Sequence, residues 1–246
     1  MNFEKILRDL ENGSIRCAQL ENGKWKVNLE VKKAILEAFK QGKLVQQGGF
    51  IDKDTLLPQQ FDLSRKIRIV PGGSSVRAGA FVAEGVIIMP PSFINVGAYV
   101  DSGSMVDSHV LIGSCAQIGK NVHLSAGVTI GGVLEPIGEN PVIIEDNTFI
   151  GAGSTLVEGV LIKKRAVLAP GVFLSKSVPI YDIVNERVLE KGEAIPEDAV
   201  VVPGTRPAKK DLKWASSLGL SLNCALIVKY RDKKSQESLN LEELLR

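Results

Sequence analysis

An aliphatic residue recurs at every sixth position through the middle of this chain. Starting from Val76, ten successive positions six residues apart are all aliphatic, the last being Ile130. The residue four places after each of the first nine is small or medium-sized, from Ala80 to Val128. Because large aliphatics make up roughly a quarter to a third of an ordinary chain, ten of them in phase do not arise by chance.

This period predicts a triangular β-solenoid, in which each hexad supplies one short strand and one corner. The aliphatic side chains point inward and stack on residues 18 positions away, because three hexads complete one coil. Glycine and asparagine suit the tight corners, and the residues expected there are Gly97, Gly113, Gly119 and Asn121. A β-sandwich, the alternative, would show a period of two and turns every 8–12 residues.

The six-residue period is interrupted once and then resumes, and this interruption indicates the domain organisation. The period stops at residues 133–143 and returns from Ile144 to Ile180. A loop of this length is usually functional or contacts a neighbouring molecule. We therefore predict a β-helix over residues 66–182 with a loop insertion at 133–143.

The two flanks read differently from the solenoid. Residues 2–13 and 28–44 have helical spacing with a short strand between them, so residues 1–65 are expected to form a helical domain that caps the solenoid. Residues 183–246 suggest a small α+β cap with a hairpin, two strands and a terminal helix at 238–246. Caps at both ends would cover exposed strand edges.

Composition excludes several classes of protein. The formal net charge is +2 and the pI about 8.3, without the basic stripe of a nucleic-acid-binding protein. No apolar run approaches the ~20 residues of a membrane span, and the charged amphipathic N-terminus is unlike a signal peptide. Three distant cysteines indicate free thiols in a reducing cytoplasm. The two histidines, His109 and His123, lack metal-site spacing, so no metal is expected.

Three features depart from the repeat and are candidates for chemistry. Asp101 and Asp107 directly follow inward aliphatics, so their carboxylates should point outward. Gly131 and Gly132 precede the inserted loop and expose backbone that a ligand could approach. Arg68 lies just before the first coil and has the planar fork that binds a carboxylate.

One long stretch resembles a known family. The tetrahydrodipicolinate N-succinyltransferases carry a segment similar to INVGAYVDSGSMVDSHVLIGSCAQIGKNVHLSAGVTIGGVLEP, residues 94–136. The segments NPVIIEDNTFIGAGS and LVEGV and the tail NCALIVK…LEELLR match the same family in the same order. The resemblance covers most of the chain from about residue 65 and is more diffuse before it.

The resemblance implies a homotrimer of left-handed parallel β-helices with active sites between neighbouring subunits. It implies transfer of a succinyl group from succinyl-CoA, a co-substrate, to the amino group of tetrahydrodipicolinate, in lysine and diaminopimelate biosynthesis. No permanently bound cofactor is implied. Arg68 matches the family's substrate-binding arginine, and Asp107 matches the aspartate that binds substrate and is our catalytic candidate.

Several positions differ from the family pattern. Gly153 and Thr155 stand where members carry an arginine and a glutamate, and His109 stands where a tryptophan is common. Thr155 cannot act as a carboxylate, which leaves the second acidic group of the site unassigned. Glu158 is the nearest stand-in along the sequence. These differences leave open a preference for acetyl or another acyl group.

The chemistry limits what Asp107 can do. An amine with a pKa near 10.4 and a carboxyl with one near 3.9 are mismatched by ~6.5 units, roughly 9 kcal/mol. We therefore expect Asp107 mainly to orient the amine, with partial base character. Backbone amides of Gly131 or Gly132 are weak candidates for contacting the cofactor or the tetrahedral oxyanion.

Other assignments remain open from the sequence. His109 is a rival general base, as in several hexapeptide acyltransferases. The basic runs at 163–165 and 209–210 are candidates for the CoA phosphates, although solvated lysines are the simpler interpretation. A related acyltransferase acting on another amine, or a non-catalytic solenoid scaffold, are the alternative functions.

Overall fold

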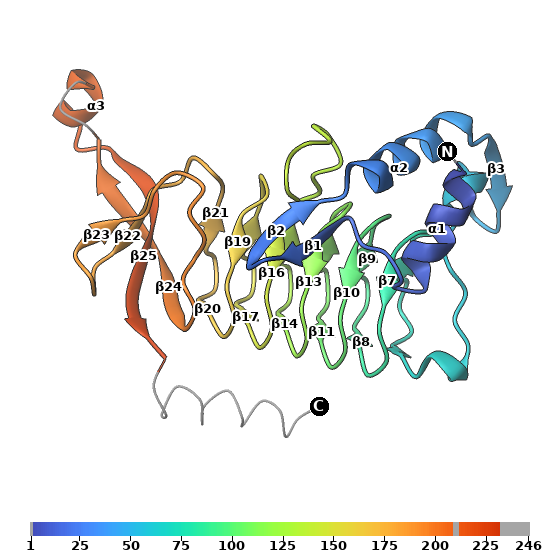
Figure 1. Ribbon diagram of the computed structural model, residues 1–246. Helices are drawn as coiled ribbons and strands as arrows, with labels where there is room; N and C mark the ends of the chain where they lie inside the picture. The colour runs from blue at the N-terminus through green and yellow to red at the C-terminus, as the bar shows by residue number, and fades with distance from the viewer. Residues whose placement is uncertain (1, 209–211, 232–246) are drawn as a thin grey trace.

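The computed structural model describes residues 2–208 and 212–231, and it shows a long three-sided solenoid (Figure 1). The N-terminal segment lies along one side of this solenoid, and a two-stranded arm projects from its C-terminal end. The predicted fold class, a mainly β parallel β-helix built from hexapeptide repeats, is confirmed, and its left-handed sense stays a prediction from the resemblance. The predicted terminal helix at 238–246 lies outside the described residues.

Three sheets form the sides of the solenoid. The first has five strands: β7 (Phe81–Val82), β10 (Tyr99–Val100), β13 (Gln117–Ile118), β16 (Ile143–Ile144) and β19 (Leu161–Ile162). The second has six: β6 (Ser75–Val76), β9 (Phe93–Ile94), β12 (Leu111–Ile112), β15 (Thr129–Ile130), β18 (Thr155–Leu156) and β21 (Phe173–Leu174). The third has ten among the described residues: β5 (Arg68–Ile69), β8 (Ile87–Ile88), β11 (Met105–Val106), β14 (His123–Leu124), β17 (Phe149–Ile150), β20 (Val167–Leu168), β22 (Ile180–Asp182), β23 (Arg187–Val188), β24 (Ala199–Pro207) and β25 (Ser221–Tyr230).

From β6 to β21, the second residue of each two-residue strand is the inward aliphatic that the period predicts. Val100 pairs with Ile118, 18 residues on, and Ile118 pairs with Ile144, 26 residues on, because the inserted loop intervenes. The side chains of this interior ladder are at most 3% exposed from Val76 to Leu174. Small residues four places later are buried too; the Ser104 hydroxyl donates to the Gly119 carbonyl at 2.8 Å. The register is therefore fixed by burial of one continuous apolar column.

The corner glycines serve two different purposes. Gly97 and Asn121 have φ of +75° and +52°, the left-handed backbone expected of them. Gly113 and Gly119 are not among the residues with positive φ. A Cβ on Gly113 would lie 2.1 Å from the nitrogen of Gly132, because the chain crosses over it as it enters the inserted loop. Glycine at 113 is therefore required by close backbone approach.

The N-terminal domain is not purely helical. Its predicted helices are confirmed, and the Asn2 and Asn28 side chains cap them by accepting from backbone amides. It also contains two antiparallel hairpins, of which only one strand was predicted. Its elements are α1 (Phe3–Glu11), β1 (Ala18–Glu21), β2 (Lys24–Val27), α2 (Leu29–Gln41), β3 (Leu44–Gln47), β4 (Phe50–Lys53) and the 3-10 turns η1 (Asp54–Leu56) and η2 (Leu63–Arg65).

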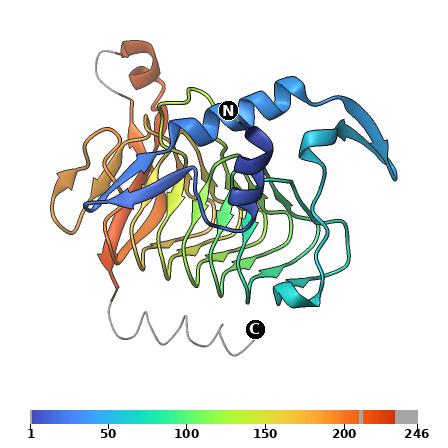
Figure 2. The same ribbon diagram turned by 45° about the vertical axis from the view of Figure 1, so that its right-hand side comes forward.

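Most of this domain lies along the five-stranded sheet, and its last part packs against the first coil at the N-terminal end of the solenoid, where Phe61 contacts the interior column (Figures 1 and 2). The Arg16 guanidinium stacks 3.6 Å from the Tyr99 ring centroid and donates to the Gln117 side chain at 2.8 Å. The Trp25 indole donates to Glu145 at 2.9 Å. One flat face of the solenoid is therefore covered by the chain's own N-terminus.

The solenoid continues beyond residue 182, past the boundary that the hexads suggested. Ile195 bridges to Ile162, and Val201, six residues later, is in register with Leu168. Both Ile195 and Val201 are at most 1% exposed and extend the interior column. Strand β24 then leaves the solenoid with β25 as a long antiparallel arm, and α3 (Lys213–Ser217) lies at its tip.

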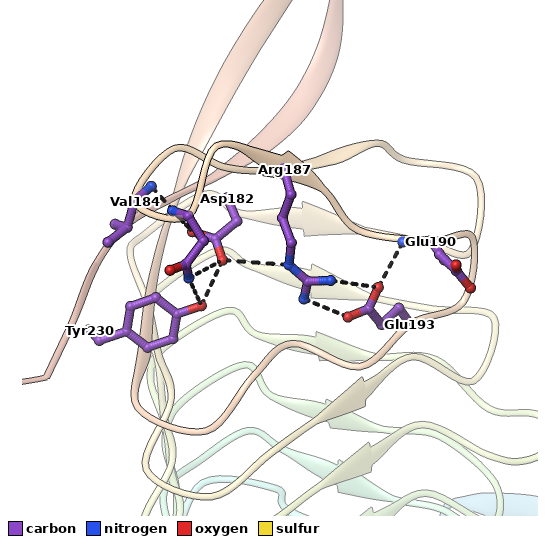
Figure 3. Close-up of polar contacts among 7 residues, drawn as sticks. Asp182, Val184, Arg187, Glu190, Glu193 and Tyr230 are labelled. Atoms are coloured by element: carbon purple, nitrogen blue, oxygen red, sulfur yellow. Dashed lines mark hydrogen bonds and ion pairs between the residues drawn. The ribbon is translucent and has the colours of Figure 1, made fainter.

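A buried carboxylate holds the C-terminal end together (Figure 3). Asp182 is 1% exposed and accepts hydrogen bonds from the Tyr230 hydroxyl at 2.7 Å and the Asn185 amide at 2.8 Å. Arg187 lies 3.9 Å from the same carboxylate and pairs with Glu193 at 2.6 Å. Burial acts to raise the pKa of Asp182, but these hydrogen bonds outweigh it and hold the pKa below its ordinary value.

Replacing Asp182 with asparagine is expected to lower the free energy of unfolding by about 1–3 kcal/mol at pH 7. A depressed folded pKa stabilises the protein above the unfolded value of about 3.9, so this difference should shrink as pH falls below about 4. Denaturant titrations at several pH values measure it. Glu190→Gln removes a charge from an exposed neighbour and is the control. A deficit that stays constant into acid would contradict the assigned role.

Candidate functional site

The structure places Arg68 and Asp107 on the same side of the solenoid. Arg68 begins β5, which pairs with β8, and β8 pairs with β11. Asp107 directly follows β11. Because neighbouring strands lie about 4.8 Å apart, the strands carrying these two residues are about 10 Å apart. A guanidinium and a carboxylate thus share the N-terminal end of the ten-stranded sheet.

The backbone around Asp107 is held firmly. Its amide donates to the Leu124 carbonyl at 3.0 Å, and its own carbonyl accepts from the Ser92 hydroxyl at 2.7 Å. Its Oδ1 accepts from the Ser108 amide at 2.7 Å. Within residues 2–208 and 212–231, no donor is assigned to its Oδ2. The half-buried carboxylate therefore keeps one oxygen for an external donor such as a substrate amine.

Arg68 is positioned by its backbone and left open at its side chain. Its amide donates to the Val86 carbonyl at 3.0 Å, which joins β5 to the solenoid. The residue is exposed, and no ion pair of its guanidinium is found in the part of the chain that is described. An exposed planar guanidinium of this kind can bind a carboxylate through two parallel hydrogen bonds.

His109 occupies the same corner as Asp107, and this corner will be called the Asp107 corner. It comprises the turns that lead from the ten-stranded to the six-stranded sheet, such as residues 107–110 and 151–154. His109 has φ of +62° and is exposed, and its amide donates to the Pro91 carbonyl at 2.9 Å. The structure therefore leaves open the role of His109 as the general base.

The other two positions that differ from the family pattern, Gly153 and Thr155, lie in or directly after another turn of this corner. Gly153 has φ of +68° and takes the place of His109 two coils further along. A Cβ added to Gly153 would have no neighbour within 4 Å. Thr155 begins β18 and is paired with Thr129 and Phe173 on the six-stranded sheet. Gly153 therefore lies at the Asp107 corner two coils further along the axis, about 10 Å away, and Thr155 begins the adjoining strand of the six-stranded sheet.

Gly131 and Gly132 lie at a different corner, between the six-stranded and five-stranded sheets, which will be called the Gly131 corner. The width of the six-stranded sheet separates them from Asp107 within one chain. The Gly131 amide already donates to the Leu156 carbonyl at 2.8 Å, so it is not available to an oxyanion. Gly132 is exposed, and a contact of its amide with the cofactor or the oxyanion stays a prediction. Glu158 is also at this corner, so the structure does not place it beside Asp107.

The inserted loop contacts both the N-terminal domain and the last coils of the same chain. The Lys32 ammonium of α2 donates to the Glu139 carbonyl at 2.6 Å, and the Asn140 amide lies 3.4 Å from the Trp25 carbonyl. The Glu139 carboxylate forms an ion pair with Lys176. The loop thus joins the N-terminal domain to the last coils, an intramolecular role that its sequence did not reveal.

The basic candidates for CoA divide into three cases. Arg165 is engaged by Asp198 at 2.7 Å and Glu197 at 2.9 Å, so its role is structural. Lys163 and Lys164 are exposed. The run at 209–210 lies outside the described residues.

A cavity of about 230 Å³ lies at the C-terminal end of the solenoid, between the last coil and the β22–β23 region. Leu174, Val178 and Ile195 contribute to its apolar lining, and Arg68 and Asp107 do not line it. Among the described residues, no three His, Cys, Asp or Glu side chains are grouped so as to hold a metal ion. None of the described helices has the length and apolar character to cross a membrane.

Comparisons with known proteins cover almost the whole chain. A family model described as the hexapeptide repeat of succinyl-transferase matches residues 141–176. Another, described as the tetrahydrodipicolinate N-succinyltransferase N-terminal region, matches residues 2–40. The N-terminal part, where the resemblance was diffuse, is therefore also recognisable.

Three relatives share one name, 2,3,4,5-tetrahydropyridine-2,6-dicarboxylate N-succinyltransferase. The protein of Blochmanniella pennsylvanica is 46% identical over 250 residues, covering 98% of this chain and 88% of the relative. That of Legionella pneumophila strain Corby is 46% identical over 253 residues, with 99% and 87% covered. That of Ralstonia nicotianae is 45% identical over 254 residues, with 98% and 87% covered. With this identity sustained along its length, the chain belongs to the 2,3,4,5-tetrahydropyridine-2,6-dicarboxylate N-succinyltransferase family.

Proposed function

We propose that this chain transfers the succinyl group of succinyl-CoA to the amino group of tetrahydrodipicolinate, in its ring-opened 2-amino-6-oxopimelate form. The step belongs to lysine and diaminopimelate biosynthesis. The observation that carries the proposal is 46% identity over 98% of the chain to a relative named for this activity. Succinyl-CoA is a co-substrate, and no resident cofactor is proposed.

The reaction forms one bond and breaks another at the thioester carbonyl. The neutral amine attacks this carbon, a tetrahedral oxyanion forms, and the C–S bond then breaks as CoA leaves as a thiolate. Thiolate departure is favourable because thiols have pKa values near about 8.5. The amine must lose a proton, which passes to Asp107 or solvent and finally to the thiolate.

Asp107 and Arg68 have complementary roles in this proposal. Asp107 accepts a hydrogen bond from the substrate amine at its Oδ2 and so aims the nitrogen lone pair at the thioester. Arg68 binds a substrate carboxylate. The support is that Arg68 lies in β5 and Asp107 directly follows β11, two strands about 10 Å apart in one sheet. The backbone of Asp107 is also held by hydrogen bonds at its amide and its carbonyl.

The assembly proposed is a cytoplasmic homotrimer with its sites between subunits. The separation of Gly132 from Asp107 within one chain supports this, because an amide from a neighbouring subunit could complete a site that a single chain leaves open. Nucleic acid and membrane are not proposed as partners.

A thiol-release assay tests the function. Purified protein is mixed with tetrahydrodipicolinate and either succinyl-CoA or acetyl-CoA, and free CoA thiol is followed over time. Release with succinyl-CoA is expected. Release with acetyl-CoA alone would instead support a related acyltransferase, an alternative that the differences at Gly153 and Thr155 leave open. No release with either donor would support the non-catalytic scaffold.

A further inference from the structure

Two cysteines meet where the N-terminal domain contacts the solenoid. Cys17 lies just before β1, and Cys115 lies at the Gly131 corner between β12 and β13. Both are fully buried, and both belong to the apolar cluster that joins α1, α2 and this corner. Both sulfur atoms lie beside the backbone of Gly97, which precedes β10. Residues 98 positions apart in sequence thus bring two sulfur atoms together.

The backbone of Gly97 provides the space for this contact. A Cβ added to Gly97 would lie 2.7 Å from the Cys17 sulfur and 3.1 Å from the Cys115 sulfur. Both sulfurs therefore flank the same small space. A disulfide needs its sulfur atoms to approach to about 2.05 Å, so the two sulfurs would have to move together from the two sides of this space.

We propose that Cys17 and Cys115 form an oxidisable dithiol, a modification site at which a disulfide covalently fastens the N-terminal domain to the solenoid. This site is independent of the proposed transferase reaction. Neither cysteine shares a corner with Asp107, and neither is used in the mechanism. In a reducing compartment the dithiol form prevails, and the disulfide forms during oxidative stress.

The oxidation balances with hydrogen peroxide as the oxidant. One thiolate attacks a peroxide oxygen, which gives a sulfenic acid and, after protonation, one water. The second thiol then attacks the sulfenic sulfur, the S–S bond forms, and a second water leaves. The two cysteines together lose two electrons and two protons, and one peroxide is reduced to two waters.

In the folded protein, burial of the two thiols slows their oxidation. Burial raises the pKa of the Cys17 thiol well above its ordinary value, and the Cys115 thiol adds to this effect. Lys32, also fully buried, acts in the opposite direction by favouring the thiolate. Because the thiolate is the reactive form, oxidation should be slow in the folded chain. It should accelerate when the N-terminal domain loosens and water enters.

The modification can be mapped on the full-length protein without any substitution. The reduced chain is treated with hydrogen peroxide in a low, non-denaturing concentration of urea and then unfolded for thiol titration. The titratable thiols should fall from the three cysteines of the sequence to one, and peptide mapping should find Cys17 joined to Cys115 with loss of two hydrogens. Three remaining thiols, oxygen uptake on separate cysteines or cross-links between chains would each overturn the proposal.

Variants and a stability measurement sharpen the test. Cys224, also buried, is the matched control, so Cys224→Ser should still lose two thiols to an internal bond, whereas Cys17→Ser should form none. The oxidised wild-type chain should unfold several degrees higher than the reduced one, because the link closes a long loop. An internal bond in Cys17→Ser, or an unchanged midpoint after complete oxidation, would count against the fastening role.

Discussion

Replacing Asp107 with asparagine is expected to lower turnover by about a hundredfold or more. Asparagine preserves the shape, the bond from the Ser108 amide and the backbone contacts to Leu124 and Ser92. It presents an NH₂ group where a substrate amine would donate, so the amine loses its acceptor. Initial rates of thiol release measure this loss, and the sedimentation profile shows whether the assembly is unchanged.

Asp101 offers a closely matched control for this experiment. Its Oδ1 accepts from the Ser102 amide at 2.7 Å, the same local arrangement that Asp107 makes with Ser108. Asp101 lies at the corner between the five-stranded and ten-stranded sheets, away from the Asp107 corner. Asp101→Asn should keep turnover within about twofold of wild type. Equal turnover in Asp107→Asn and wild type would remove Asp107 from the mechanism.

Truncating Ile118 to alanine is expected to lower the free energy of unfolding by about 2–5 kcal/mol. Ile118 is fully buried and stacks between Val100 and Ile144 in neighbouring coils. Val100 and Ile144 cannot move into the cavity that the truncation leaves, because the hydrogen bonds between the coils hold their backbones in place. The midpoint of a denaturant titration at unchanged slope measures the difference.

A surface leucine provides the comparison for that variant. Leu63 is 98% exposed in η2, so Leu63→Ala should change stability by no more than about 0.5 kcal/mol. If both variants unfolded at the wild-type midpoint, the interior column would not be the main source of stability.

The solenoid was predictable because its register and its burial obey one rule. Every inward position from Val76 to Ile130 follows from the period of six, since a shift would expose an aliphatic. The same period was not recognised at Ile195 and Val201, because only these two positions follow a long interruption. Extending it backward predicts Val70 as inward, yet the structure pairs Ile69 with Ile88. The strand that carries Arg68 is therefore offset by one residue.

The placement of the N-terminal domain could not be predicted from periodicity. The sequence pattern of outward residues such as Tyr99 and Gln117 is the same whether their side chains contact water or another part of the chain. What decides is the contact with Arg16, which is 101 residues from Gln117 in sequence. The candidate site has the same limitation, because the substrate-binding role of Arg68 came from the resemblance and only the structure brings Arg68 to the sheet whose strand β11 leads into Asp107.

The in-register stacking of the coils has a consequence for how such a chain can evolve. A change of volume at Ile118 is felt first by Val100 and Ile144, which touch it from the coils on either side. Compensating substitutions should therefore be coupled at separations of 18 residues, and of 26 across the inserted loop, while adjacent positions drift independently. Sequence divergence in this protein is constrained along the axis of the solenoid far more than along its chain.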